Sequence, residues 1–293
     1  MAFNRPPISG KTGVYCLIGD PVDHSLSPAI QNAAFGSAGI DAIYVAFRVR
    51  KHDVKSAIHG LRSIGVRGFN VTTPLKTTII NHLDELNPAA DQVRSVNTIV
   101  TGTNGAFTGY NTDGIGAVKA LQLAGAPMDG NVLLIGAGGA GRAIAFAVAP
   151  HVKSIRVANR TLSKAKQLER LLKRTFQLEV ACHPLAHIRD VVEQVDLIIN
   201  ASSMGMNGQA DLQLEERWLG PDQWVMDIVY RPRETRLLKV ATRAGARTLD
   251  GLDMLIGQGA CSFELWTERP APVEEMRRAL TQKSLEFAHA QNC

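Results

Sequence analysis

The sequence predicts an α/β protein of two domains, and three observations support this fold class. Short runs of β-branched and other apolar residues alternate with helical stretches along the chain, which is typical of parallel α/β architecture. Apolar residues make up 45% of the chain and charged residues 20%, enough for a core and too little charge for a disordered protein. The length of 293 residues exceeds the size at which one core usually stops growing, which favours two domains over one.

The first half of the chain alternates between predicted strands and helices. Residues 14–19 form an apolar run typical of a buried strand. Ser27 begins a helix, because Pro28 follows it and suits the first helical turn. Asn104-Gly105 is a strong hairpin signal between two short strands. The other predicted elements of this half are strands at 44–49, 68–72, 96–100 and 107–110 and an amphipathic helix at 54–64.

The second half is predicted to be a doubly wound unit followed by a helical tail. A strand at 132–136 leads into a helix at 140–149. From Leu252 onward the pattern is helical, and packing back on the first domain would bury this tail economically. The remaining predicted elements are strands at 154–158, 196–201, 224–229 and 248–249 and helices at 162–174 and 234–244.

Charge and cysteine content exclude several functions. The chain carries 32 Lys and Arg against 27 Asp and Glu, a net charge of +5, and the charges are spread rather than gathered in the basic stripe of a nucleic-acid-binding protein. A modest positive balance suits an enzyme that handles small anions. The four cysteines form no C-x-x-C pair, so we expect no metal. The sequence begins without the apolar segment of a signal peptide and has no run typical of a membrane helix, so we expect a cytoplasmic protein.

A glycine-rich turn, GAGGAG at residues 136–141, fits the G-x-G-x-x-G pattern between a strand and a helix. The first glycine makes the tight turn, the second lets the backbone approach a pyrophosphate, and the third lets helix and strand pack closely. A purely structural turn is the alternative, and the strand–turn–helix context favours a dinucleotide site. The predicted cofactor-binding residues of the turn are Gly136, Ala137, Gly138, Gly139 and Ala140.

The end of the next predicted strand favours NADP over NAD. An NAD site usually carries an acidic residue there for the ribose 2′-hydroxyl, whereas this chain has Asn159-Arg160-Thr161. Arg160 can pair with a 2′-phosphate, and Lys164 follows one helical turn later. The alternative is a solvated cation at a strand end.

Three clusters in the first half are candidates for substrate chemistry. Ser25 and Ser27 offer two hydroxyls at a helix N-terminus, where they could hold a carboxylate or merely serve the turn and the cap. Lys76 follows the strand end and is expected to begin a helix, where the dipole disfavours an ammonium and can depress its pKa; a solvated lysine is the alternative. Asp113 is either functional or the N-cap of the helix that follows it.

Taken together, these clusters resemble the shikimate/quinate dehydrogenase family. The motifs that carry the resemblance are G-D-P-V-x-H-S-L-S-P, N-V-T-x-P-x-K, V-N-T, N-T-D-G, G-A-G-G-A, N-R-T and G-x-x-M-L-x-x-Q, which occur in this order. The resemblance implies an N-terminal α/β substrate domain completed by C-terminal helices and a central Rossmann domain that binds NADP. In this chain they would span residues 1–113 with 251–293 and residues 114–250.

The resemblance also implies roles for single residues. Lys76 and Asp113 would be the catalytic pair, and Ser25 and Ser27 would hold the substrate carboxylate. The loop at residues 202–206 would lie near the nicotinamide. The further implied contacts are Thr72, Asn97, Tyr230 and Gln258 with the substrate and Ile228 and Gly251 with the cofactor. Position 164 departs from the family, in which arginine is frequent there, and this weakens its part in the phosphate contact.

The implied activity is the reversible NADPH-dependent reduction of 3-dehydroshikimate to shikimate, with small molecules as partners and a homodimer allowed. The alternatives are a quinate-preferring or dual enzyme, methylenetetrahydrofolate dehydrogenase, and a silent sensor homologue. The H-S-L-S-P cluster argues against the folate enzyme. Intact Lys76 and Asp113 argue against a sensor.

Overall fold

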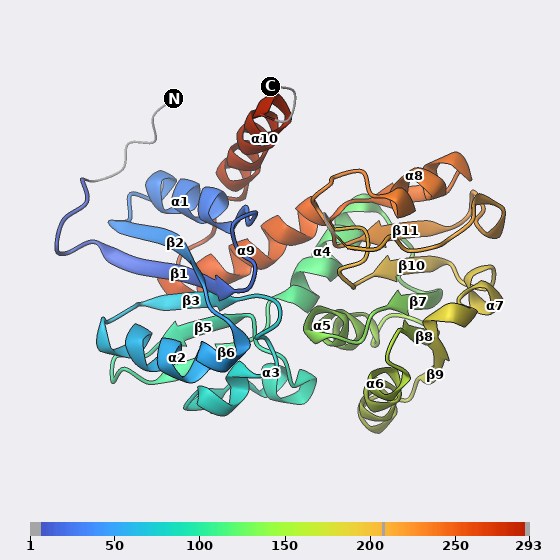
Figure 1. Ribbon diagram of the computed structural model, residues 1–293, viewed down its shortest axis with the longest axis horizontal. Helices are drawn as coiled ribbons and strands as arrows, with labels where there is room; N and C mark the ends of the chain where they lie inside the picture. Colours follow the sequence, from blue (N-terminus) through green and yellow to red (C-terminus); the bar gives the residue numbers. More distant parts are fainter. Residues whose placement is uncertain (1–6, 207–208, 291–293) are drawn as a thin grey trace. The chain divides into compact units, whose positions relative to one another are not determined.

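The computed structural model describes residues 7–206 and 209–290, with side chains to residue 282 (Figure 1). The chain forms two compact units. Unit 1 holds the chain up to Thr112 and from Ile256 onward, and unit 2 holds Asp113–Leu255. Each unit is built on its own six-stranded sheet, which confirms the α/β class.

The sheet of unit 1 is mixed. Its strand order is β2-β1-β3-β5-β6-β4. β1 pairs in parallel with both β2 and β3, whereas β5 runs antiparallel to β3 and β6. The predicted hairpin joins β5 to β6, and Gly105 has a φ of +78°, which glycine adopts without strain. The strands are β1 (Gly13–Gly19), β2 (Ala42–Arg48), β3 (Gly68–Val71), β4 (Glu85–Leu86), β5 (Thr98–Thr101) and β6 (Phe107–Tyr110).

Helices cover both faces of this sheet, and the C-terminal helices are among them. Phe263 lies with its ring centroid 5.5 Å from that of Phe35, and Trp266 lies 5.1 Å from Tyr15, so the helical tail packs on unit 1 as predicted. Phe69 and Phe107 are fully buried in the cluster on the other face. The helices are α1 (Ser27–Ser37), α2 (Val54–Ser63), α3 (Pro88–Val93), α9 (Gly251–Thr267), whose residues up to Leu255 belong to unit 2, and α10 (Val273–Ala290).

The sheet of unit 2 is entirely parallel and doubly wound. Its strand order, β12-β11-β10-β7-β8-β9, is the 3-2-1-4-5-6 order of a Rossmann fold. The strands are β7 (Asn131–Ile135), β8 (Ser154–Asn159), β9 (Glu179–Pro184), β10 (Leu197–Asn200), β11 (Trp224–Asp227) and β12 (Arg247–Leu249). The helices are α4 (Asp113–Ala124), α5 (Gly139–Val148), α6 (Leu162–Thr175), α7 (Arg189–Val192) and α8 (Arg236–Arg243).

Several details differ from the sequence-based expectation, which did not include β4, α3 and α7. The edge strand β9 was not predicted, because only Val180 of its six residues is buried and the run lacks an apolar signal. The helix expected at Lys76 does not form: residues 73–78 make turns, and a short 3₁₀ helix covers Ile79–His82. The helix-dipole argument for Lys76 is therefore wrong. Among the described residues, no helix combines the length and apolar character that crossing a bilayer requires.

Candidate active site

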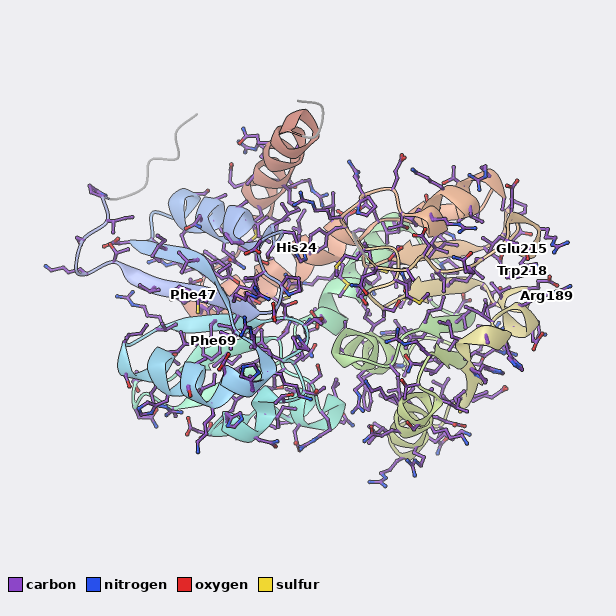
Figure 2. The ribbon with its side chains drawn as sticks, in the orientation of Figure 1. His24, Phe47, Phe69, Arg189, Glu215 and Trp218 are labelled. Atoms are coloured by element: carbon purple, nitrogen blue, oxygen red, sulfur yellow. The ribbon has the colours of Figure 1, made fainter. Side chains whose placement is uncertain are left out.

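Ser25 lies in the turn between β1 and α1, next to His24, which Figure 2 labels, and Ser27 is the first residue of α1. Leu26 is the N-cap residue of α1 and makes no side-chain cap, whereas the Ser27 backbone N–H donates to Ser25 Oγ at 3.2 Å. The Ser27 hydroxyl bonds to no other described residue. Ser25 thus serves the turn in part, and the Ser27 hydroxyl remains available to an anion at this helix N-terminus.

Thr72 and Lys76 follow the carboxyl end of β3. The Thr72 N–H donates to Ile18 O at 2.9 Å, and a side chain at Gly19 would collide with the Thr72 methyl group, so glycine at position 19 permits this close approach. Lys76 is half-buried, and its carbonyl accepts from the Val96 N–H at 2.8 Å. The structure thereby brings the lysine next to the start of β5.

Asn97 and Gln258 meet although they are distant in sequence. Asn97 Nδ2 lies 3.4 Å from Gln258 Oε1 and 2.9 Å from Thr112 Oγ1, and Asn97 Oδ1 accepts from the Thr112 N–H at 2.8 Å. Asn97 is 3% exposed, while Gln258 is half-buried. Unit 1 therefore gathers two amide side chains, typical partners for ring hydroxyls.

Asp113 and Tyr230 belong to unit 2. Asp113 is the first residue of α4 and is 3% exposed. Tyr230 is half-buried and follows the carboxyl end of β11. Because Lys76 belongs to unit 1 and Asp113 to unit 2, their pairing stays a prediction.

The glycine-rich turn has the local geometry that dinucleotide binding requires. Gly136 has a φ of +108°, and its close approach to Ala201 O leaves no room for a side chain. A Cβ at Gly141 would collide with Gly136 O, so this glycine sets the contact between β7 and α5. A Cβ at Gly138 would meet nothing within 4 Å. Gly138 is the N-cap of α5 and carries no side-chain cap, so the first-turn N–H groups face this open side.

The carboxyl end of β8 carries the residues predicted to choose the cofactor. Asn159 supports the glycine-rich turn, because its Oδ1 accepts from the Ala137 N–H at 3.1 Å and its Nδ2 donates to Thr161 O at 2.8 Å. Arg160 and Lys164 are exposed, and neither forms an ion pair within the described ranges. A 2′-phosphate fits two such cations better than a ribose hydroxyl does.

Ile228 and Gly251 lie against each other, since a Cβ at Gly251 would collide with the Ile228 backbone. A neighbouring polar network was not predicted. Asn200 Oδ1 accepts from the Ser202 N–H at 3.1 Å, and its Nδ2 donates to Met204 O at 3.1 Å and Asp227 Oδ1 at 3.0 Å. This network holds the 202–206 loop to the sheet. The sequence does hint at this network, because each of the apolar strands β10 and β11 ends in a polar residue. In the sheet these two residues, Asn200 and Asp227, lie opposite each other.

Asp227 is a buried carboxylate with three donors. Thr235 Oγ1 donates to it at 2.7 Å, and the Val229 N–H and Asn200 Nδ2 each donate at 3.0 Å. Burial nevertheless dominates these hydrogen bonds and raises the pKa of Asp227 to about 6.

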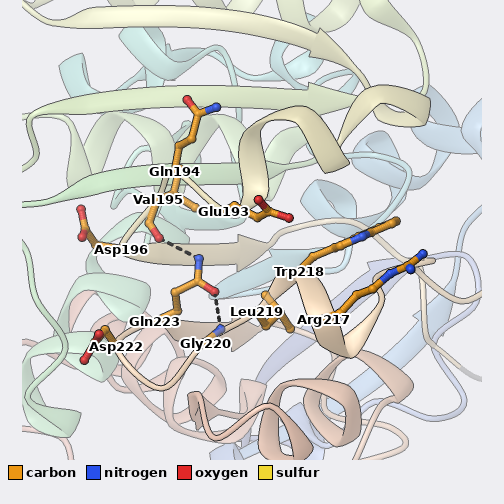
Figure 3. Close-up of a pocket in the computed structure, with 10 residues that line it drawn as sticks. All are labelled: Glu193, Gln194, Val195, Asp196, Arg217, Trp218, Leu219, Gly220, Asp222 and Gln223. Carbon is orange, nitrogen blue, oxygen red and sulfur yellow. Dashed lines mark hydrogen bonds between the residues drawn. The ribbon is translucent and has the colours of Figure 1, made fainter.

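A cavity of about 500 Å³ lies elsewhere in unit 2, at the amino-terminal ends of β10 and β11 (Figure 3). Gln223 stands in its lining and donates to Val195 O at 2.9 Å while accepting from the Gly220 N–H at 3.0 Å. None of the predicted site residues lines this cavity. The predicted cofactor residues instead follow carboxyl ends of strands, where ligands bind in open α/β sheets.

Comparison with known families covers most of the chain. The family described as "Shikimate dehydrogenase substrate binding domain" matches residues 17–99, and "Shikimate / quinate 5-dehydrogenase" matches residues 119–214. The family described as "Shikimate 5'-dehydrogenase C-terminal domain" matches residues 251–281.

Similar proteins match over nearly their whole length. Shikimate dehydrogenase (NADP(+)) of Pyrococcus furiosus is 45% identical over 271 residues, which cover 92% of this chain and 96% of the relative. A crystal structure of shikimate dehydrogenase in complex with NADP+ has a TM-score of 0.88 at 42% identity and covers 94% of this chain and 97% of its own. Shikimate 5-dehydrogenase from Listeria monocytogenes, in complex with shikimate and NAD, has a TM-score of 0.85 at 35% identity, with coverages of 94% and 98%.

Proposed function

Because this chain belongs to the shikimate dehydrogenase family, we propose that it reduces 3-dehydroshikimate to shikimate reversibly with NADPH, in the chorismate route to aromatic amino acids. The observation that carries the proposal is the 45% identity over 92% of the chain to an NADP(+)-dependent shikimate dehydrogenase. This match confirms the family resemblance that the ordered motifs predicted.

Unit 2 is the NADP-binding domain in this proposal. NADP supplies the hydride acceptor, and NADPH the hydride donor, at the nicotinamide ring. The turn at 136–140 holds the pyrophosphate with backbone N–H groups at the start of α5, where Gly138 leaves the approach open. Arg160 and Lys164 pair with the 2′-phosphate. The other cofactor contacts are Asn159, Thr161, Ile228 and Gly251.

Unit 1 is the substrate domain and sets the orientation of the ring. Ser25 and Ser27 hold the carboxylate. The support for this role is that the Ser27 hydroxyl, at the start of α1, makes no hydrogen bond to another described residue. Thr72, Asn97 and Gln258 hold ring oxygens, with Tyr230 as a further contact. Binding energy gained far from the reacting carbonyl thus aligns that carbonyl.

Lys76 and Asp113 serve the proton transfer at the reacting oxygen. In the reducing direction the carbonyl carbon gains a hydride and its oxygen gains a proton, which Lys76 donates; in the reverse direction Lys76 takes that proton back. Asp113 accepts a hydrogen bond from the reacting hydroxyl. The supporting observation for Lys76 is its half-buried position beside the start of β5.

Initial rates with shikimate and quinate, each with NADP+ and NAD+, test the proposed function. We expect the highest kcat/KM for shikimate with NADP+. Higher kcat/KM for quinate would make the chain a quinate-preferring enzyme, and no turnover in any of the four combinations would contradict the enzyme assignment.

We place the activity in the cytoplasm, as expected from the sequence, and cell fractionation tests this location. A homodimer stays a prediction, which light scattering of the purified chain would test.

A further inference from the structure

A fully buried hydroxyl pair lies beneath the predicted substrate contacts of unit 1. Ser262 is 0% exposed and stands on α9 one turn after Gln258, and its Oγ donates to Gln258 O at 3.0 Å. Thr98 is also 0% exposed, and its Oγ1 lies 2.8 Å from Ser262 Oγ and 3.0 Å from Asn97 Oδ1. The pair therefore lies between Asn97 on one side and Gln258 on the other.

Each hydroxyl has one proton, which limits how the pair can be hydrogen-bonded. If Ser262 donates to Thr98, Thr98 donates to the Asn97 side chain; if Thr98 donates to Ser262, Ser262 donates to the Gln258 carbonyl. The first arrangement links Ser262 on α9 to the Asn97 side chain, and the second links Thr98, the first residue of β5, to the Gln258 carbonyl on α9. The direct contact between Asn97 Nδ2 and Gln258 Oε1 is longer, at 3.4 Å, and is the weaker constraint.

Asn70 ties this pair to the centre of the sheet. Its Nδ2 lies 3.0 Å from Ser262 Oγ, Thr98 Oγ1 and Asn97 O, and its Oδ1 accepts from Tyr44 Oη at 2.7 Å. The Asn70 amide therefore has other acceptors when the Ser262 hydroxyl is removed. Loss of that hydroxyl removes the link to α9 without leaving this amide unsatisfied.

We propose that Ser262 is a positioning residue whose hydroxyl fixes Gln258 on α9 against Asn97, so that both amides meet the substrate ring in one geometry. The inference rests on the proposed function, in which Asn97 and Gln258 contact the substrate. Ser262 has no exposed surface and does not touch the substrate itself. Its effect should fall on substrate binding, because Ser262 bonds to residues of unit 1, whereas the proposed cofactor contacts, including Gly251 at the start of α9, belong to unit 2.

Ser262→Ala tests this role through the separation of KM from kcat. We expect KM for shikimate to rise about tenfold, as the loss of roughly one hydrogen bond implies. We expect kcat to fall by less than threefold and KM for NADP+ to stay unchanged. Ser262→Cys keeps the size and a weak donor, so its KM should lie between those of the wild type and Ser262→Ala.

Thr267→Val is the matched control. Thr267 Oγ1 donates to Phe263 O at 2.8 Å, the same bond to the residue four positions earlier that Ser262 makes, in the same helix. Thr267→Val removes the same type of bond from the same helix and should leave KM for shikimate unchanged.

Two results would overturn the inference. If wild-type enzyme turns over shikimate and both Ser262 variants keep its KM, Ser262 has only a structural role. If the KM for shikimate rises equally in Thr267→Val, the effect reflects general helix stability. A wild-type protein without shikimate turnover would instead contradict the proposed function, and the inference with it.

Discussion

At the scale of single residues, the side chains proposed for chemistry differ in how their positions arise. Lys76 sits in a run of turns that the sequence pattern did not suggest. The backbone bond from Val96 to its carbonyl holds it beside the residue that precedes Asn97. Its proposed role therefore depends on contacts between strands rather than on a helix dipole.

Lys76→Met should lower kcat by about 10²–10⁴, the usual contribution of a positioned acid or base. KM for shikimate should change little, because the lysine mainly serves the proton. Steady-state kinetics in both directions measure this, with Lys55→Met on the exposed surface of α2 as control. A kcat within a few-fold of the wild type would move the proton role to another residue, and Asp113 would be tested next.

Arg160→Ala should weaken NADP binding by about 1.5–3 kcal/mol, the range for a hydrogen bond to a charged group, and leave NAD binding nearly unchanged. The ratio of kcat/KM for NADP+ over NAD+ should fall about ten- to a hundredfold, at the low end if Lys164 shares the phosphate. Arg170→Ala, an exposed arginine on α6, is the control and should leave the ratio alone. A wild-type ratio below one would refute the preference for NADP.

At the scale of elements, different glycines of the turn between β7 and α5 serve helix packing and ligand binding. Gly141 touches the backbone of Gly136, and backbone cannot rotate away as a side chain can. Gly138 has a φ of −80° and a ψ of −167°, which alanine adopts readily, and its Cβ position is open. Gly141 is therefore required for the packing of α5 on β7, whereas Gly138 keeps space open for a ligand.

Gly141→Ala should destabilise the unliganded protein by about 1–3 kcal/mol, because α5 must move away from β7. Gly138→Ala should leave the melting temperature of the unliganded protein unchanged and raise KM for NADP+ about tenfold or more, because the methyl group occupies the approach of the pyrophosphate. Thermal unfolding and initial rates measure the two effects. If Gly138→Ala bound NADP+ normally, the pyrophosphate would have to lie elsewhere.

At the scale of the whole molecule, Asp227 links global stability to pH. Its folded pKa of about 6 lies above its ordinary value of 3.8, because it is buried at the end of β11. The folded state therefore binds more protons than the unfolded state between these values. The stabilisation is complete below 3.8 and is lost as the pH rises toward about 6.

Asp227→Asn should remove this dependence. The stability of the wild type relative to this variant should fall by on the order of 3 kcal/mol between about pH 4 and pH 7. Chemical denaturation of both proteins across this range provides the measurement, and the difference between them cancels the other titrating groups. A constant difference would show that Asp227 keeps an ordinary pKa when folded.

The sequence by itself determined what depends on neighbouring residues. Apolar periodicity located most strands and helices, Asn104-Gly105 predicted the hairpin, and the spacing of Gly136, Gly138 and Gly141 predicted their local geometry. The ordered motifs also identified the family. These features are local, because a turn, a cap or a period of two or 3.6 is set by consecutive residues.

Only the tertiary structure decided the networks that support the site. Asn70 and Ser262 are 192 positions apart, and Asn200 and Asp227 are 27 apart on neighbouring strands. The edge strand β9 likewise depends on pairing with β8 rather than on its own apolar content. The turns around Lys76 replaced a predicted helix. Side-chain hydrogen bonds between distant segments leave no periodic signal in the chain, because only the folded sheet brings their donors and acceptors within about 3 Å.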